Sequence, residues 1–184
     1  MTKAGEYYQQ AAELLADGEQ KVSYLNEAGR GFYYAGLYSQ SEPLFQQALA
    51  IYNQVLGEQH PLYATSLNNL ASLYYSQGKY EQAEPLFQQA LAIRKQVLGE
   101  QHPLYAQSLN NLAELYRVQG KYEQAEPLHQ QALAIRKQVL GEQHPDTVTS
   151  LNNIAVLLDA AIARMPTFQE ATNALNQANE TLNI

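Results

Sequence analysis

Apolar residues recur along the chain with the spacing of an amphipathic helix. Leu109, Leu112, Ala113 and Tyr116 follow the i, i+3, i+4, i+7 pattern, which places them on one helical face. Gly120 comes next, where a glycine can take the left-handed conformation that ends a helix. A longer apolar stripe then follows: Tyr122, Ala125, Leu128, Ala132, Leu133, Ile135, Val139 and Leu140. The pattern predicts two helices joined by a tight turn.

This two-helix pattern repeats with a period of 42 residues. Segments 42–83 and 84–125 differ at only six of 42 positions, which are numbered 52, 53, 65, 72, 75 and 76 in the first copy. The next copy begins at residue 126, and segment 24–41 is a divergent one. A helical hairpin cannot bury its apolar stripe alone, whereas stacked hairpins bury a continuous core. The repeat therefore predicts an all-α solenoid.

The period also predicts the domain organisation, a single solenoid domain over residues 1–184. An N-terminal capping helix falls in 1–20, and four repeats follow at 21–60, 61–102, 103–144 and 145–184, the last with a C-terminal capping helix. About nine helices and no strand are expected, with the helices at 4–16, 21–35, 38–56, 61–77, 79–98, 103–119, 121–140, 145–164 and 167–182. In the first repeat, Gly29 and Gly31 replace Ala and Leu of the later copies. Since glycine costs about 1 kcal/mol in a helix, this repeat is expected to be the softest.

The repeat carries a recognisable set of residues. They are Leu67, Leu70, Ala71, Tyr74, Gly78, Tyr80, Ala83, Phe87 and Ala90. This pattern resembles the tetratricopeptide repeat family, and its 42-residue length, with LNNLA and LGEQHP, is similar to the variety in kinesin light chains and many bacterial proteins. The resemblance covers nearly the whole chain. It implies a right-handed α-solenoid in which the first helix of each pair lines a concave face that binds extended peptides, and it is far more specific for fold than for function.

Carried over by position, this resemblance implies a groove rich in asparagine. Its expected residues are Asn26, Arg30, Tyr33, Asn68, Asn69, Ser72, Tyr75, Asn110, Asn111, Glu114, Arg117, Asn152 and Asn153. An asparagine amide both donates and accepts, so a row of them can pair with a peptide backbone. The alternative is that these amides only solvate a helix face or bond to neighbouring helices. Only Arg30 and Arg117 are basic here, so we expect no strong binding of the acidic tails that chaperone-type relatives hold.

Other side-chain chemistry is sparse. His60, His102 and His144 recur before proline, one per repeat, and are predicted to open helices, because one repeat apart is too far for a shared metal ion. His129 replaces a phenylalanine and is predicted to pack in the core. No carboxylate pair lies near a His or Ser constellation, so neither an enzyme activity nor a metal or cofactor is expected.

Two Leu-Tyr pairs leave a choice open. Leu62-Tyr63 and Leu104-Tyr105 occupy equivalent places, where the fourth repeat has Asp146-Thr147. They either fill the gap between repeats or form an exposed apolar rim, and filling is the favoured interpretation.

Charge and composition exclude several classes of ligand, site and location. The chain has 11 basic and 18 acidic residues, a net charge of −7, which disfavours nucleic acid as a ligand. There is no cysteine, which excludes disulfides and thiolate sites. The apolar runs are too short to span a membrane, and the N-terminus lacks the apolar stretch of a secretory signal, so a cytoplasmic location is expected.

The leading hypothesis is a non-catalytic interaction scaffold that binds an extended segment of a protein partner along the groove. The alternative is a structural spacer or assembly element, either a designed or idealised array or a fragment of a larger scaffold or signalling protein. Near-identical repeats present complementary ends, so this alternative allows a monomer or weak end-to-end self-association. A third interpretation, RNA binding, needs a basic groove and conflicts with the charge.

Overall fold

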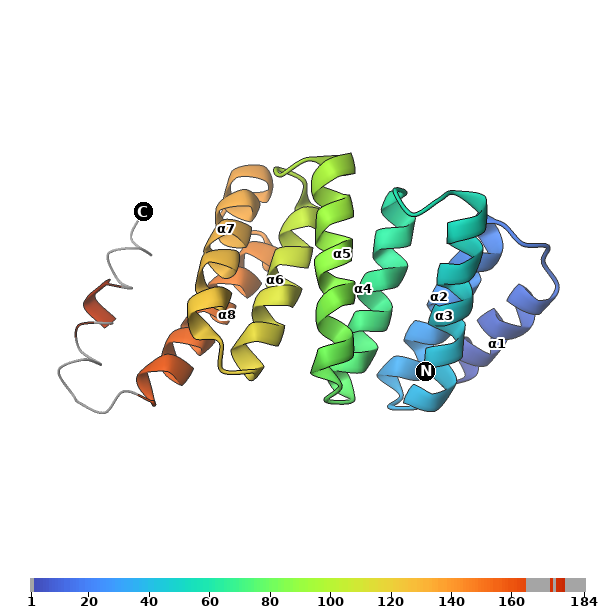
Figure 1. Cartoon of the computed structure of the whole chain (residues 1–184), viewed down its shortest axis with the longest axis horizontal. Helices are drawn as coiled ribbons and strands as arrows, with labels where there is room; N and C mark the ends of the chain where they lie inside the picture. The colour runs from blue at the N-terminus through green and yellow to red at the C-terminus, as the bar shows by residue number, and fades with distance from the viewer. Residues whose placement is uncertain (1, 165–172, 174, 178–184) are drawn as a thin grey trace.

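The computed structural model describes residues 2–164, 173 and 175–177, and this part of the chain forms a row of paired helices (Figure 1). The helices are α1 (Thr2–Glu13), α2 (Glu19–Tyr34), α3 (Tyr38–Val55), α4 (Pro61–Ser76), α5 (Tyr80–Leu98), α6 (Pro103–Val118), α7 (Tyr122–Leu140) and α8 (Pro145–Ile162). Each bound lies within three residues of its prediction. The ninth predicted helix, at 167–182, falls mainly outside the described residues.

The helix ends follow from local chemistry. His60, His102 and His144 cap α4, α6 and α8, because each Nδ1 accepts a hydrogen bond from the backbone N–H two residues on, at 3.2, 3.1 and 3.1 Å. A proline follows each histidine at the first helical position, where no backbone donor is lost. This confirms the prediction that the three histidines open helices.

Helix pairs stack along the long axis, with α1 at one end and α8 at the other (Figure 1). Each helix packs against the next along the chain, and α2, α4, α6 and α8 also contact one another in turn. Tyr63 and Tyr105 are buried between repeats, which confirms that they fill the gap. Leu62 and Leu104 remain partly exposed beside the loops, so within each pair the tyrosine packs inward and the leucine forms a rim. In the described part, no helix is both long and apolar enough to cross a membrane.

A tyrosine on the first helix of one repeat bonds to the second helix of the preceding repeat. The Tyr74 hydroxyl donates to Glu42 at 3.1 Å and accepts from Gln46 at 3.4 Å. Tyr116 makes the same pair of bonds one repeat later, to Glu84 at 3.3 Å and from Gln88 at 3.1 Å. The next equivalent position is Leu158, so the joint between α7 and α8 lacks these tyrosine bonds, although the matching Glu126 and Gln130 are present.

Installing the missing tyrosine should strengthen the last joint. We expect Leu158→Tyr to raise the free energy of unfolding by about 0.5–1.5 kcal/mol, the net contribution of a hydrogen bond. Urea denaturation measures the change. Leu158→Phe is the matched control, because it supplies the ring without the hydroxyl. An equal gain in both variants would show that ring packing, not the bond to Glu126, is responsible.

Candidate functional site

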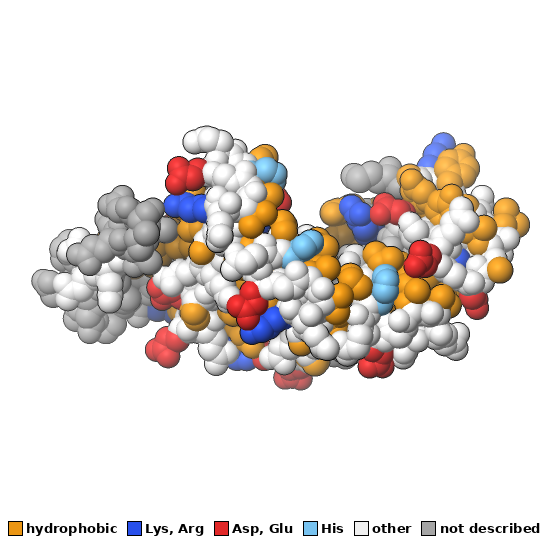
Figure 2. Space-filling model, turned by 90° about the horizontal axis from the view of Figure 1, so that it is seen from above, with side chains coloured by type: hydrophobic (Ala, Val, Ile, Leu, Met, Phe, Trp, Pro, Cys, Tyr) orange, Lys and Arg blue, Asp and Glu red, His pale blue; other side chains and the backbone are white. Residues whose placement is uncertain are grey.

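The concave side of the stack carries a polar groove, seen from above in Figure 2 as the hollow in the outline of the molecule. Its main cavity measures about 450 Å³ and is lined almost wholly by α2, α4 and α6. The lining residues are Asn26, Glu27, Arg30, Tyr33, Tyr34, Phe45, Thr65, Asn68, Asn69, Ser72, Gln107 and Asn111. A smaller hollow of about 180 Å³ adds Tyr75, Phe87 and Glu114, and it shares Tyr33, Ser72 and Asn111 with the first. The two therefore form one continuous groove.

Most of the predicted site residues thus meet in one place. The structure brings together residues of the first three helix pairs, from Asn26 on α2 to Glu114 on α6. On α8, Asn152 is exposed and Asn153 half-buried, but neither lines this groove, and on α6 the predicted Asn110 and Arg117 do not line it either. Sequence reasoning missed Thr65 and Gln107, which line the cavity. The signal that could have found them is that position 65 is one of the six at which two repeats differ.

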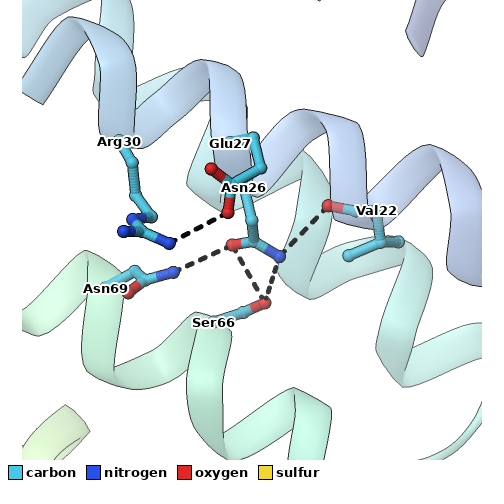
Figure 3. A network of polar contacts seen from close by, with 6 residues as sticks. All are labelled: Val22, Asn26, Glu27, Arg30, Ser66 and Asn69. Carbon is cyan, nitrogen blue, oxygen red and sulfur yellow. Dashed lines mark hydrogen bonds and ion pairs between the residues drawn. The ribbon is translucent and has the colours of Figure 1, made fainter. Parts of the chain in front are cut away.

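Asn26 is the first node of the asparagine row (Figure 3). Its Nδ2 donates to the Val22 carbonyl and to the Ser66 hydroxyl, both at 3.1 Å. A carbonyl can only accept, so these bonds fix the orientation of the Asn26 amide. Its Oδ1 then accepts from Asn69 Nδ2 at 3.2 Å. The Asn69 amide is thereby fixed as well, with its carbonyl oxygen left for a ligand.

Asn68 and Asn110 differ from the other asparagines in being buried, at 7% and 5% exposure. Asn68 Oδ1 accepts from Asn111 Nδ2 at 2.9 Å, and Asn110 Nδ2 donates to Ser150 at 2.9 Å, so each links one repeat to the next. Bonding to neighbouring helices, the alternative role weighed for these residues, is what the structure shows at both positions.

The two basic residues predicted for the groove each pair with a carboxylate. Arg30 bonds to Glu27 at 2.9 Å, on the exposed edge of α2. Arg117 makes two bonds to Glu114, at 2.8 and 2.7 Å, and Glu114 also accepts from the Tyr75 hydroxyl at 3.0 Å. Each guanidinium therefore already shares its hydrogen bonds with a carboxylate of its own helix.

The contacts among Tyr75, Glu114 and Arg117 shift the pKa values of these side chains. Burial works to raise the pKa of Glu114, but the hydrogen bonds and charge of Arg117 outweigh it, and the net pKa lies below its usual range. Burial, together with the carboxylate of Glu114, raises the pKa of Tyr75 to about 12. At neutral pH the groove here presents an ionised carboxylate and a protonated phenol, and the Arg117 guanidinium is bonded to that carboxylate.

His129, the predicted packing histidine, is fully buried on α7. Its Nδ1 lies 2.8 Å from Asn110 Oδ1, which can only accept, so Nδ1 carries the proton. The other ring nitrogen, Nε2, is buried without a partner. Burial lowers the pKa of His129 to about 4, although the nearby carboxylate of Glu114 acts in the opposite direction. His129 is therefore neutral at physiological pH.

Within the described ranges, no group of three or more His, Cys, Asp or Glu side chains is placed to hold a metal ion. What the groove offers is hydrogen bonding through amides, hydroxyls and paired charges, with the aromatic rings of Tyr33, Tyr34 and Tyr75 beside them. These groups can donate hydrogen bonds to, and accept them from, another polar molecule.

Comparison with known proteins identifies the class. The family model for the tetratricopeptide repeat matches residues 22–96, 65–138 and 104–178, which together cover most of the chain. The chain therefore belongs to the tetratricopeptide repeat family, whose members are typically protein-interaction scaffolds. No curated protein matches the sequence.

Solved structures show the same architecture. A putative kinesin light chain of Podosopora anserina with nearly identical TPR-like repeats is 26% identical, with a TM-score of 0.73, covering 98% of this chain and 86% of that one. BtubC (BKLC) from P. vanneervenii is 26% identical, with a TM-score of 0.77, covering 98% and 72%. The Sgt2 TPR domain of Aspergillus fumigatus, at 19% identity and a TM-score of 0.56 over 80% and 86%, shares the fold alone. The repeats are thus of the kinesin-light-chain type, and the predicted right-handed α-solenoid is confirmed.

Proposed function

We propose that this chain is a non-catalytic scaffold that binds an extended segment of a protein partner along the concave groove, in the cytoplasm. The groove runs across three helix pairs, which suits a ligand in extended conformation rather than a compact small molecule. Its outward amide and hydroxyl groups match the alternating donors and acceptors of a peptide backbone. Because Arg30 and Arg117 are already paired, we expect no strong affinity for acidic C-terminal tails.

One observation carries this proposal: the differences between the two near-identical repeats gather at the groove. Positions 65, 72 and 75 all line it, and so do their counterparts Gln107 and Glu114. A fourth difference, Ser76, bonds to Tyr33 of the lining at 2.8 Å. Apart from Tyr52, which Arg94 replaces, the repeats share their buried core residues, and three of their six differences line the groove. That distribution is expected of a binding surface and is not required of an inert spacer.

A repeat-swap variant tests the proposal. Thr65→Gln, Ser72→Glu and Tyr75→Arg together give the second repeat the groove residues of the third, so the variant uses only side chains that the same fold already accommodates. Peptides are first selected on the wild-type chain from a random display library. We expect them to bind the swap variant at least about tenfold more weakly, a change of about 1.4 kcal/mol.

Asn53→Lys is the matched control. It exchanges another of the six differing positions, but Asn53 is exposed on α3 and does not line the groove. Binding should survive this change. Equal binding by the wild type and the swap variant would place the peptide elsewhere on the surface. A library without any binder would contradict the proposal and favour the spacer or end-to-end assembly instead.

A further inference from the structure

A buried arginine lies beneath the floor of the groove. Arg94 on α5 is 1% exposed, and its Nη1 donates to the Leu104 carbonyl at 2.9 Å and to the Ser108 hydroxyl at 2.9 Å. The same guanidinium also contacts two residues of the cavity lining: Nη1, whose two hydrogens are shared among three acceptors, lies 3.2 Å from Gln107 Oε1, and Nη2 donates to Thr65 Oγ1 at 3.4 Å. All four acceptors are neutral, and no carboxylate of the described residues pairs with this charge.

The contacts of Arg94 with Leu104 and Ser108 lie away from the groove, and those with Gln107 and Thr65 lie at its lining. The equivalent arginine of the next repeat shows which of the two pairs is needed to join repeats. Arg136 also bonds to a backbone carbonyl, that of Asp146, and to a serine, Ser150, both at 2.9 Å. The residue matching Gln107 is Thr149, whose hydroxyl bonds instead to the Pro145 carbonyl at 2.9 Å. Joining two repeats therefore needs only the carbonyl and the serine. The bonds from Arg94 to the groove lining are additional.

The bond to Gln107 determines which end of that amide faces the groove. A guanidinium has donors and no acceptor, so it can hold only the carbonyl oxygen of the amide. The NH₂ group of Gln107 is then left on the exposed side, where the residue lines the cavity. Burial lowers the pKa of Arg94 to about 10, so the guanidinium stays charged at neutral pH and this orientation persists.

We propose that Arg94 is a positioning residue that turns the Gln107 NH₂ group into the groove, so that the part of a bound segment lying over this floor presents a hydrogen-bond acceptor. A cation or a donor there would face both the outward NH₂ and the uncompensated charge of Arg94 below it. This inference rests on the proposed peptide-binding function. It adds one requirement on the ligand: a hydrogen-bond acceptor opposite the NH₂ group of Gln107.

The first test is Gln107→Glu. The carboxylate keeps an oxygen for Arg94 and turns that bond into an ion pair, so the variant should unfold at an equal or higher urea concentration. Its other oxygen replaces the outward donor by an acceptor. Peptides selected from a random display library on the wild-type chain should bind this variant at least about tenfold more weakly. Gln96→Glu, an exposed position on α5 outside the groove, controls for the added charge.

The second test moves a natural pair between interfaces. At the preceding interface Tyr52 and Thr65 occupy the positions of Arg94 and Gln107, so Arg94→Tyr with Gln107→Thr transplants a combination that this fold already contains. The urea stability of both single variants and the double gives a coupling energy for the wild-type pair. We expect clear non-additivity, and loss of the selected peptides in the double variant.

The outcomes separate the two proposals. Enriched peptides that bind Gln107→Glu as tightly as the wild type would overturn the positioning role and leave the peptide-binding function standing. Additive effects of the Arg94 and Gln107 changes would overturn it without reference to any peptide. Failure to enrich any peptide on the wild-type chain would reject the proposed function itself, and the ligand polarity with it.

Discussion

Acidification from pH 7 to pH 4 is expected to cost this fold about 3 kcal/mol through His129 alone. The imidazole has a pKa near 6.5 in an unfolded chain and about 4 in the folded one, because burial disfavours its charged form. Between these values the unfolded chain binds more protons than the folded chain. Stability is therefore fully present above pH 6.5 and is lost as the pH falls toward 4.

His129→Phe isolates this contribution. Phenylalanine stands at the equivalent positions 45 and 87, where it is buried, so the site accepts an aromatic ring. The change removes the unpartnered Nε2 and leaves Asn110 Oδ1 open to Asn153, as Asn68 Oδ1 accepts from Asn111 one repeat earlier. The loss of unfolding free energy between pH 7 and pH 4, measured by urea denaturation, should be about 3 kcal/mol smaller in the variant.

Carboxylates also titrate in this range, but they do so in both proteins and cancel in the comparison. Asn110→Ala in the His129→Phe background checks that the repaired amide contact contributes to the result. If the wild type and His129→Phe lose stability in parallel on acidification, His129 is not the acid-sensitive group.

Gly29→Ala is expected to destabilise the chain by about 1–2 kcal/mol, the opposite of what helix propensity predicts. Alanine is better than glycine by about 1 kcal/mol within a helix, and the equivalent residues Ala71 and Ala113 are alanines. At Gly29, however, a Cβ atom would lie 2.5 and 2.8 Å from ring atoms of Phe45. Phe45 is itself buried, so the ring cannot swing into solvent, and overpacking typically costs 1–3 kcal/mol or more.

The next repeat provides the matched comparison. Ala71→Gly should also destabilise, because there the methyl group is buried and the helix prefers alanine. Glycine is therefore expected to be the more stable residue at position 29, and alanine at the equivalent position 71. Adding Phe45→Leu to Gly29→Ala should recover part of the loss, since it removes the ring that the methyl group meets. A more stable Gly29→Ala variant, measured by urea denaturation, would show that helix propensity prevails and that Phe45 moves freely.

Gly29 also shows why one expectation from sequence was incomplete. Counting glycines in a helix suggests a soft first repeat, but the space that the missing methyl group vacates is occupied by Phe45. Ser41, which replaces a packing alanine, donates a 2.7 Å hydrogen bond to the Gly29 carbonyl. The substitutions in this repeat form a local set, and only the three-dimensional contacts reveal that they belong together.

The sequence by itself determined the helices, their order and the repeat. Helical periodicity, the His-Pro starts and the turn glycines are local signals, and the 42-residue period makes stacking the one way to bury every stripe. The helices and their ends depend on neighbours a few residues away, which the sequence displays directly. The concave location of Arg30, Tyr33, Ser72 and Glu114 was instead implied by the resemblance to the tetratricopeptide repeat family, in which the first helix of each pair lines the concave face.

Only the tertiary structure decided how the polar residues divide between joint and groove. Asn68 and Asn69 are adjacent, identical in type and both border the cavity, yet Asn68 is buried and bonded to Asn111 of the next repeat, whereas Asn69 is half-buried. The position of Arg94 near a helix end suggests a surface residue. In the structure it lies beneath the groove and orients Gln107, 13 positions later. Such roles depend on the angle at which one helix meets the next repeat, and side-chain hydrogen bonds across that joint are not encoded in local periodicity.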